Sequence, residues 1–292
     1  MICTRLEGGL GNQLFQYAAG KALAVLHNTD LIFDTGAFEN TSRRVTPRHF
    51  ELGHFSVTGR KAHKDEIQLI PVVRYAPWIF HWLSSWNLHQ EKSQNFDHSF
   101  FSAPNHTYLS GYWQSHRYIA NVAEEVFQEL RNTQPLSQRN EELSKEIAES
   151  NSVALHVRRG DYVTLSTAAK YHGALPLDYS IRALGSLQGL LDRPRIYVFS
   201  DDPEWCAAHL PLGSTETIFI AHNCGENSWQ DLVLMSLCHH HIIANSSFSW
   251  WGAWLADQRW GNAGRIVFAP ERWFVTRAIN LSDRFPEKWK VI

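Results

Sequence analysis

The 292-residue sequence lacks several features that would place the protein in a specialised class. It has four cysteines, Cys3, Cys206, Cys224 and Cys238, and no two of them form a C-x-x-C pair. This argues against a zinc ribbon or a thioredoxin-like site, and it favours a reduced, cytoplasmic protein. No run of 18 apolar residues occurs and no signal peptide opens the chain, so we expect no transmembrane helix.

The charge pattern also excludes some partners. The formal net charge is −2 and no long basic run is present, so we expect no nucleic-acid binding. Twelve tryptophans are present, either as additional core aromatics or as surfaces on which sugar rings stack. The length suits one large domain or two of about 150 residues, and a core of that size needs no metal or disulfide.

The second half alternates between apolar runs and helical patterns. We expect strands at 153–157, 195–200, 216–220, 241–244 and 265–269. Helices are expected at 176–191, 202–210, 228–239 and 247–257, with a capping box at Ser228 opening the third. Continuous apolar strands that alternate with helices predict a parallel sheet covered on both faces.

The first half begins in the same way. Strands are expected at 2–6, 30–34 and 107–113, and helices at 12–28 and 115–132. The region 35–106 is irregular and rich in aromatics, with WIFHWLSSW (78–86) at its centre. We predict an α/β protein with two Rossmann-like domains, residues 1–145 and 146–292, which face each other across a cleft.

Two adjacent arginines follow the strand at 153–157, in the sequence VALHVRRGDY. His156 and Arg158 share one face of this strand, because side chains alternate along it. Arginine matches phosphate oxygens bidentately, so Arg158 and Arg159 predict a site for a diphosphate, with Asp161 holding one guanidinium. The alternative is an internal Arg–Asp pair that only fixes the loop.

Two further strand ends carry polar residues. Asp202 is predicted to be the N-cap of the following helix. Asp201 is then available to accept a hydrogen bond from a nucleobase or a ribose. The alternative is that Asp201 is a solvated acid in the loop. Ser246, Ser247 and Phe248 precede or open the helix at 247–257, where free N–H groups favour a phosphate. Simple capping by serine is the other interpretation. Together these segments predict an anionic nucleotide at the carboxyl edge of the second sheet.

The turn GLGNQ at 9–13 has a rival interpretation. It partly matches the dinucleotide-binding pattern G-x-G-x-x-G, and Asp34 ends the next strand at roughly the distance expected for a ribose contact. The third glycine is replaced by Leu14, which weakens the match. Otherwise the segment is a tight turn, or Glu7 to Gln13 meets the sugar end of a nucleotide. The run His239–His241 has no carboxylate partner at metal-ligand spacing, so no metal site is expected there.

Four segments in order resemble the α1,2-fucosyltransferases of glycosyltransferase family 11. They are EGGLGNQLFQYAAGKALA, HVRRGDY, YVFSDD and ANSSFSWWGAWL. The resemblance covers most of the chain, and it implies a GT-B-like fold, GDP-fucose as donor, a galactose-terminated acceptor, inversion at the anomeric carbon and no metal. Eukaryotic members carry an anchor before the first motif. Because this chain starts at that motif, it resembles the bacterial enzymes. We expect it in the cytoplasm or at the periphery of the inner membrane. The oligomeric state is left open.

The resemblance also implies roles for individual residues. Arg159 is expected to bind the phosphate directly, with Arg158 in support. His156, Asp161 and Asp201 are expected to line the guanosine pocket or hold its loop, and Ser246, Ser247 and Phe248 to hold phosphate and base. Gly11, Asn12 and Gln13 are expected to approach the fucose and the acceptor.

The catalytic base is left open between Glu7, Asp161 and no strong base at all. Two other functions stay as alternatives. One is an NAD(P)-dependent oxidoreductase that uses the GLGNQ turn, and the other is a non-catalytic carbohydrate-binding protein.

Overall fold

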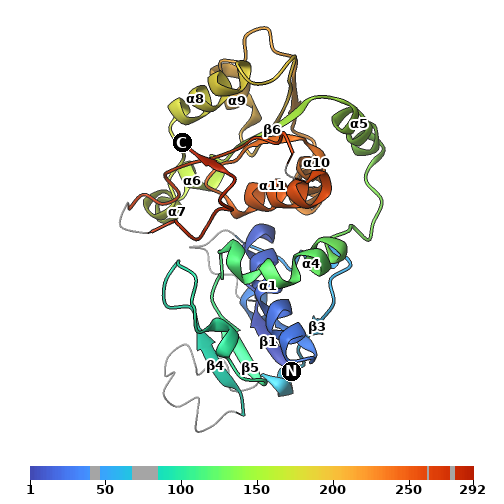
Figure 1. Cartoon of the computed structure of the whole chain (residues 1–292), viewed down its shortest axis with the longest axis vertical. Helices are drawn as coiled ribbons and strands as arrows, with labels where there is room; N and C mark the ends of the chain where they lie inside the picture. Colours follow the sequence, from blue (N-terminus) through green and yellow to red (C-terminus); the bar gives the residue numbers. More distant parts are fainter. Residues whose placement is uncertain (40–46, 68–84, 262, 277–279) are drawn as a thin grey trace. The chain divides into compact units, whose positions relative to one another are not determined.

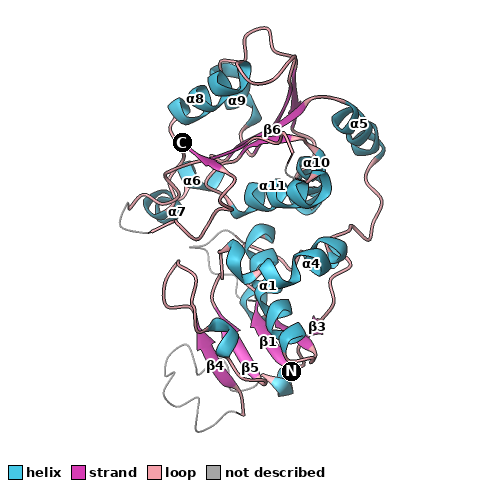
Figure 2. Cartoon of the chain, viewed as in Figure 1, coloured by secondary structure: helices cyan, strands magenta, loops and turns pink. Residues whose placement is uncertain are grey.

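The computed structural model of the chain describes residues 1–39, 47–67, 85–261, 263–276 and 280–292 (Figure 1). These residues form two compact units. The first consists of Met1–Thr133 with Asn280–Arg284, and the second of Gln134–Ile279 with Phe285–Ile292. Both contain helices and strands, which are distinguished by colour in Figure 2. The chain is an α/β protein, as predicted.

In the first unit the described strands form a five-stranded parallel sheet of order β3-β2-β1-β5-β4. Its strands are β1 (Ile2–Arg5), β2 (Leu31–Asp34), β3 (Arg60–Lys61), β4 (Asn87–Gln90) and β5 (Thr107–Ser110). The first helix, α1 (Leu10–Leu26), is buried along most of its length. The predicted strands at 2–6, 30–34 and 107–113 are confirmed. The edge strands β3 and β4 were missed because they are short and largely polar.

The predicted helix at 115–132 is wrong as a continuous element. Two 3-10 turns come first, η5 (His116–Tyr118) and η6 (Ala120–Val122), and α4 (Ala123–Glu129) follows. Tyr118 is 1% exposed, and its hydroxyl accepts the Asp97 N–H at 2.7 Å. This tertiary contact overrides the local helical pattern. The remaining 3-10 turns are η1 (Gly36–Glu39), η2 (Leu52–His54), η3 (Lys64–Glu66), η4 (Phe100–Ser102) and η7 (Gly225–Asn227). Residues 78–84 of the aromatic segment lie outside the described residues.

In the second unit the described strands form a six-stranded parallel sheet of order β11-β10-β9-β6-β7-β8. Its strands are β6 (Ser152–Val157), β7 (Arg195–Ser200), β8 (Thr217–Ile220), β9 (His240–Ile242), β10 (Val267–Ala269) and β11 (Lys290–Val291). All five predicted strands are present. β11 was missed because it contains two exposed residues only, and its pairing with β10 defines it.

The helices of the second unit connect these strands, except for α5, which precedes β6. They are α5 (Gln138–Glu149), α6 (Gly160–Thr164), α7 (Ser166–Tyr171), α8 (Leu177–Gln188), α9 (Pro203–His209), α10 (Trp229–Leu237) and α11 (Ser247–Trp260). The four predicted helices are α8 to α11. The predicted capping box is wrong, because Ser228 has helical backbone angles directly after η7 and its side chain makes no cap.

Helix α5 contains the predicted domain boundary at residue 145. The compact units instead divide after Thr133, and α5 belongs to the second unit. Leu143 and Ile147 of this helix are fully buried against Ala154 and Tyr197, which come from β6 and β7. Two buried apolar side chains four residues apart fix the helix on that sheet.

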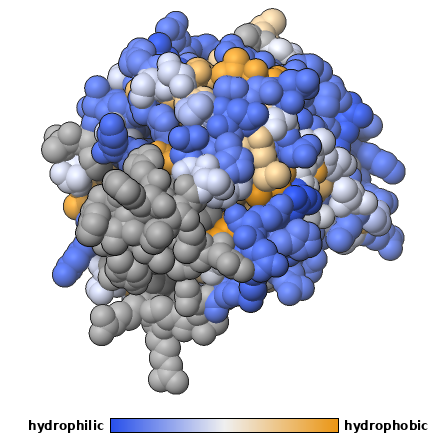
Figure 3. Space-filling view, turned by 90° about the horizontal axis from the view of Figure 1, so that it is seen from below, coloured by the Kyte–Doolittle hydropathy of each residue, from blue (hydrophilic) through white to orange (hydrophobic). Residues whose placement is uncertain are grey.

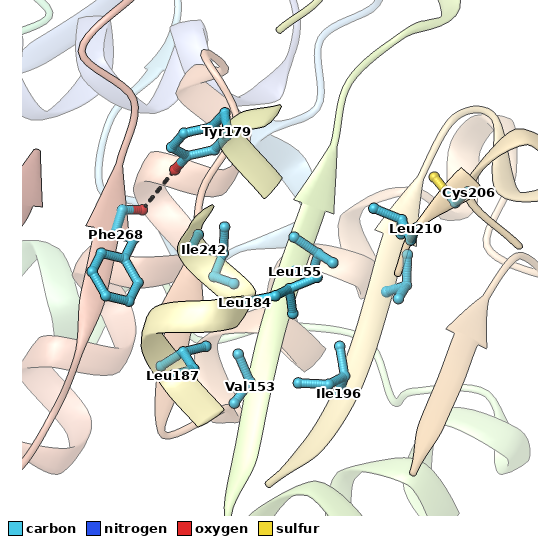
Figure 4. Packing of buried hydrophobic residues seen from close by; sticks show 12 residues of the cluster. Val153, Leu155, Tyr179, Leu184, Leu187, Ile196, Cys206, Leu210, Ile242 and Phe268 are labelled. Carbon is cyan, nitrogen blue, oxygen red and sulfur yellow. Dashed lines mark hydrogen bonds between the residues drawn. The ribbon is translucent and has the colours of Figure 1, made fainter. Parts of the chain in front are cut away.

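The core on one face of the second sheet is continuous from β10 to α9. Val153, Leu155, Ile196 and Ile242 point from the strands toward the apolar side chains of α8, as Figure 4 shows. The buried Tyr179 hydroxyl is bonded to the carbonyls of Ile243 and Phe268 at 2.8 and 3.1 Å. Truncating one of these leucines or isoleucines to alanine would cost about 2–5 kcal/mol.

Hydrophilic residues predominate on the face drawn in Figure 3, where hydrophobic ones form small separate areas. Within the described ranges, no helix is long and apolar enough to cross a bilayer.

Candidate active site

The tips of two neighbouring strands bring the predicted residues of the second unit together. β6 and β7 are parallel, and Val157 at the end of one pairs with Ser200 at the end of the other. Arg158 and Asp201 therefore leave the same edge of the sheet side by side. Gly160 permits this approach, because a Cβ there would lie 2.4 Å from Asp201 Oδ2. The glycine is thus required for close contact.

Arg158 is held by two carboxylates. Its Nη2 donates to Asp161 Oδ1 at 2.7 Å, and its Nη1 lies 3.0 Å from Asp201 Oδ2. Burial by itself would lower the pKa of Arg158, but Asp201 and Asp161 together raise it above its usual value. The guanidinium stays charged, and its charge is already matched within the chain. For Arg158, the structure therefore contains the alternative given above, an internal Arg–Asp pair that fixes the loop.

Arg159 has a different environment. Its Nε donates to Asp202 Oδ2 at 3.2 Å, and its guanidinium lies 3.8 Å from the centre of the Trp205 ring. Its backbone N–H donates to Asp201 Oδ1 at 2.8 Å. Within the described part of the chain, neither terminal nitrogen of Arg159 has a hydrogen-bond partner. This side chain is oriented by a ring and a carboxylate, and it retains two donors for an anion.

Asp202 performs the capping role that the sequence predicted. Its Oδ1 accepts the Trp205 N–H at 3.3 Å, and Pro203 begins α9. The same helix turn places Trp205 under Arg159. Sequence reasoning missed this tryptophan. Its position three residues after the cap, on the first turn of a helix that starts at a strand end, was the available signal.

His156 lies beneath the arginines and is 8% exposed. Burial lowers its pKa to about 4, and the positive charge of Arg158 acts in the same direction, while Asp201 opposes both. The imidazole is therefore neutral at neutral pH. Its Nδ1 has no hydrogen-bond partner among the described residues, and its ring lies 6.1 Å from that of Phe248.

Helix α11 begins beside these residues. Ser246 is its N-cap, with its hydroxyl accepting the Phe248 N–H at 3.3 Å, so the capping interpretation is confirmed. Ser246, Ser247 and Phe248 are all partly exposed, which leaves them accessible to a ligand. The Tyr162 hydroxyl donates to the Asn245 carbonyl at 3.2 Å and ties α6 to this helix start.

The predicted residues of the first unit cluster at the turn between β1 and α1. Glu7 forms an ion pair with Arg5 at 2.9 Å, and Gln114 donates to Asn12 Oδ1 at 2.8 Å. Gly11 is buried in the first turn of α1. Gln13 is fully buried, and its amide bonds the backbone of residues 8, 49 and 51. These bonds hold the loop at residues 49–51 against the turn at residue 8. The predicted contact of Gln13 with a sugar stays a prediction.

The features that suggested other chemistry have local explanations. Asp34 is 8% exposed and accepts from the Tyr108 hydroxyl and the Gly36 N–H at 2.7 and 2.9 Å. It is not placed to receive a ribose. His241 is buried and its Nε2 contacts the Met235 carbonyl at 2.9 Å. The described residues contain no group of three or more His, Cys, Asp or Glu side chains arranged around a metal position.

Solved structures support the fold. Fucosyltransferase NodZ from Bradyrhizobium is similar with a TM-score of 0.53 at 14% identity, over 86% of this chain and 90% of that one. A NodZ alpha-1,6-fucosyltransferase soaked with GDP-fucose gives 0.52 at 14% identity, over 87% and 91%. The chain, with its two parallel sheets, therefore has a GT-B-like fold, which confirms the predicted α/β class.

Sequence relatives identify the class of enzyme. An Escherichia coli alpha-1,2-colitosyltransferase is 36% identical, over 99% of this chain and 98% of the relative. The O-antigen biosynthesis glycosyltransferase WbnK of E. coli is 34% identical over 92% and 93%. The mouse galactoside 2-alpha-L-fucosyltransferase Sec1 is 24% identical over 87% and 64%. The protein is a glycosyltransferase. It belongs to glycosyl transferase family 11, which matches residues 1–273.

Proposed function

We propose that the protein transfers L-fucose from GDP-β-L-fucose to the 2-hydroxyl of a terminal β-galactoside, with inversion and without a metal. The observation that carries the proposal is that the two terminal nitrogens of Arg159, at the carboxyl edge of a parallel sheet, have no hydrogen-bond partner among the described residues. Ligands of such sheets bind at this edge. Solved relatives of the same fold include one soaked with GDP-fucose.

The leaving group is GDP, whose β-phosphate gains negative charge as the sugar bond breaks. Arg159 donates from its two terminal nitrogens to that phosphate and stabilises the developing charge. Trp205 and Asp202 hold the guanidinium in one orientation, so little reorganisation is needed. Arg158 supports the site by fixing Asp161 and Asp201.

The neighbouring residues form the rest of the donor pocket. Phe248 packs against the guanine, Asp201 accepts from the base or the ribose, and the α11 start with Ser246 and Ser247 receives phosphate oxygens. His156 is neutral, which makes it a hydrogen-bonding group rather than a second counter-ion. A buried neutral imidazole can recognise an uncharged part of the nucleoside.

We assign acceptor recognition and contact with the fucose to the first unit, through Glu7, Gly11, Asn12 and Gln13. Glu7 is one candidate for the base that takes the proton of the acceptor, and Asp161 is the other. Each already forms an ion pair with an arginine. We therefore propose a step led by departure of GDP, in which proton removal lags behind and a strong base is not needed.

A second donor is favoured by one comparison. The relative at 36% identity is an alpha-1,2-colitosyltransferase. Colitose is L-fucose without its 3-hydroxyl, so both GDP-sugars would present the same diphosphate to Arg159. A site that hydrogen-bonds the 3-hydroxyl would discriminate strongly against colitose, whereas an apolar pocket would discriminate weakly against fucose.

The experiment is a matrix of donors and acceptors. The purified chain is incubated with GDP-fucose or GDP-colitose and with β-galactosides of different aglycones, and product linkage is determined by NMR. We expect an α1,2-linked product from GDP-fucose. A preference for GDP-colitose would select the second candidate, and absence of transfer from either donor to every galactoside would contradict both.

A binding measurement tests the nucleotide independently of the acceptor. A single-site ligand at a hundred times its Kd adds about 2.7 kcal/mol of stability. We expect GDP to raise the melting temperature and NADP to leave it unchanged. Stabilisation by NADP but not by GDP would favour the oxidoreductase alternative. Stabilisation by free oligosaccharides alone would favour the non-catalytic carbohydrate-binding alternative.

A further inference from the structure

The ring of Trp205 contacts two other planar side chains. The guanidinium of Arg159 is 3.8 Å from the centre of this ring. The imidazole of His209 stacks on the same ring, with the ring centres 4.6 Å apart and an angle of 12° between the planes. Asp202 holds Arg159 at the start of α9, whereas His209 ends this helix one turn beyond Trp205. The two groups therefore lie on opposite faces of the ring, and we call the three side chains the Trp205 stack.

Helix α9 holds two members of the stack in register. Trp205 and His209 are four residues apart, so they are neighbours on the same side of the helix. His209 Nδ1 also donates to the Trp205 carbonyl at 2.8 Å, since a carbonyl can only accept. Cys206 and Leu210, each one position further along, are buried in the core of the second sheet, where Figure 4 shows them. The core thus fixes the rotation of α9 and the side on which the Trp205 ring lies.

The contacts of Arg159 determine how its guanidinium is oriented. The Trp205 ring fixes the plane of the group, and Asp202 Oδ2 accepts from Nε at 3.2 Å. The backbone N–H of Arg159 donates to Asp201 Oδ1 at 2.8 Å, which fixes the start of the side chain. A plane and one bond within that plane together set the direction of a rigid fork. The edge that carries the two terminal nitrogens is therefore oriented before any ligand binds.

The bond to Asp202 alone would not fix the plane of the guanidinium. A distance of 3.2 Å is at the long end for an N–H···O bond, and a single bond permits rotation about its own axis. An indole face restrains that rotation, and tryptophan is the aromatic residue that attracts a cation most strongly. Trp205 is itself partly exposed, so it needs support from behind. His209 supplies that support by covering the opposite face of the ring.

We propose that Trp205 and His209 are positioning residues for sugar transfer, which act through Arg159 by presenting its two terminal nitrogens edge-on to the β-phosphate of the donor. The inference rests on the proposed function, which assigns that phosphate to Arg159. Neither Trp205 nor His209 belongs to the four segments that resemble the family. Their role follows from the contacts around the strand end.

Two variants of Trp205 test the aromatic face. Trp205→Leu keeps an apolar side chain that can pack on the core but has no face for a cation. Trp205→Tyr keeps a face that attracts a cation less strongly. We expect kcat/KM for the GDP-sugar to fall about ten- to thirtyfold in Trp205→Leu and about threefold in Trp205→Tyr.

Two variants of His209 test the support behind the ring. His209→Ala removes the stacked imidazole from an exposed position, so we expect the melting temperature to be retained. The same variant should lower kcat/KM about three- to tenfold, because the indole is then held less firmly against Arg159. His209→Phe restores a flat ring at this position, and it should recover most of the loss.

A double-mutant cycle measures whether Trp205 acts through Arg159. Arg159→Ala removes the guanidinium, so the stack has no group left to orient. We expect Trp205→Leu to change kcat/KM and the Kd of GDP by less than about twofold in the Arg159→Ala protein. If Trp205 served the fold alone, the two losses would be additive. GMP has no β-phosphate, so Trp205→Leu in the wild-type background should weaken binding of GDP and leave binding of GMP unchanged.

A second stack in the same unit provides the matched control. The ring centres of His239 and Trp260 are 4.4 Å apart, with 26° between the planes. His239 directly precedes β9, so this stack lies at the amino edge of the sheet, away from the strand end that carries Arg159. We expect Trp260→Leu to keep kcat/KM within about twofold of the wild type. A loss as large as that in Trp205→Leu would overturn the proposal.

The outcomes distinguish the stack from the proposed function. Transfer by the wild-type chain, measured first with GDP-fucose and GDP-colitose, decides the function. If the wild type transfers sugar and the losses from Trp205→Leu and Arg159→Ala are additive, the stack proposal is overturned and the function stands. If the wild type transfers none, the cycle on the Kd of GDP decides, and additive losses or absence of GDP binding overturn the proposal. If Trp205→Leu unfolds, wild-type kcat/KM in His209→Ala overturns it.

Discussion

Arg158 connects the ends of two parallel strands through its contact with Asp201, where Nη1 lies 3.0 Å from Oδ2. The pair joins the loop after β6 to the loop after β7, and Asp161 completes it from α6 at 2.7 Å. This arrangement leaves the adjacent Arg159 free to point its terminal nitrogens elsewhere. The two neighbouring arginines therefore have different surroundings, and the proposed function gives the direct phosphate contact to Arg159.

The first prediction concerns Arg159. Lysine keeps the charge but has no planar fork, so Arg159→Lys cannot bind two phosphate oxygens at once. Losing one contact that strengthens in the transition state costs about 2.7–4 kcal/mol, or roughly a hundred- to thousandfold in rate. We expect kcat/KM to fall by that amount, GDP affinity to fall less, and the melting temperature to stay near wild type.

Asp178→Asn is the control for this variant. It removes one charge from an exposed pair with Arg182 on α8, so activity should remain near wild type. Steady-state kinetics and a melting curve for each protein are sufficient. Near-normal turnover in Arg159→Lys would remove the proposed phosphate contact.

The second prediction concerns Arg158. A lysine ammonium cannot reproduce the bonds at 2.7 and 3.0 Å to carboxylates on different loops. We expect Arg158→Lys to lower the free energy of unfolding by about 1.5–3 kcal/mol, the usual value of a hydrogen bond to a charged group. Activity should fall together with stability. Asp201→Asn should be destabilising too, because one charge of the set is lost.

The matched control is the exposed pair between Asp178 and Arg182 on α8, at 2.9 Å. Surface pairs of this kind contribute about 0–1 kcal/mol. Urea unfolding of Asp178→Asn should therefore be close to wild type. Equal effects of Arg158→Lys and Asp178→Asn would show that the strand-tip pair is not structural.

The third prediction concerns metals. In the proposed function Arg159 supplies the positive charge at the leaving phosphate, so we expect transfer to continue in excess EDTA. Initial rates are compared with and without the chelator, and then after addition of Mn²⁺. A loss with EDTA that manganese restores would contradict the proposed role of Arg159.

The fourth prediction is a dependence of stability on pH. Burial lowers the pKa of His156 to about 4, and that of His240 to about 4 with a further contribution from Arg265. His240 Nδ1 also accepts the Ile266 N–H, a bond that only the neutral ring can make. Between about pH 4 and 6.5 the unfolded chain binds more protons than the folded one. Stability is therefore complete above pH 6.5 and declines as the pH falls toward 4.

Asp231 acts in the opposite direction. Burial raises its pKa to about 7, so the folded chain holds the extra proton between about pH 3.8 and 7, and its contribution to stability declines as the pH rises. We expect Asp231→Asn to steepen the gain in stability between pH 4 and 6.5, and His240→Asn to flatten it. Urea midpoints at several pH values measure both slopes, and identical slopes in the three proteins would contradict the assignment.

The sequence determined the elements that rest on local patterns. Continuous apolar runs gave the central strands of both sheets, because such strands are buried on two faces. Asp202 before Pro203 gave the start of α9, since a cap acts on the backbone next to it. Arg158, Arg159 and Asp161 could be proposed as site residues because they directly follow a predicted strand. The strand order, which places the end of β6 beside that of β7, came only with the structure.

The tertiary structure decided what depends on contacts between distant residues. The strand β11 exists only through its pairing with β10, and the helix expected at 115–132 is broken because Tyr118 is buried where it meets Asp97. The sequence alone does not distinguish the adjacent Arg158 and Arg159. In the structure Asp201 pairs with Arg158, and the ring of Trp205 lies beneath Arg159. Burial and partner geometry assign these roles, and neither is a property of a single position in the sequence.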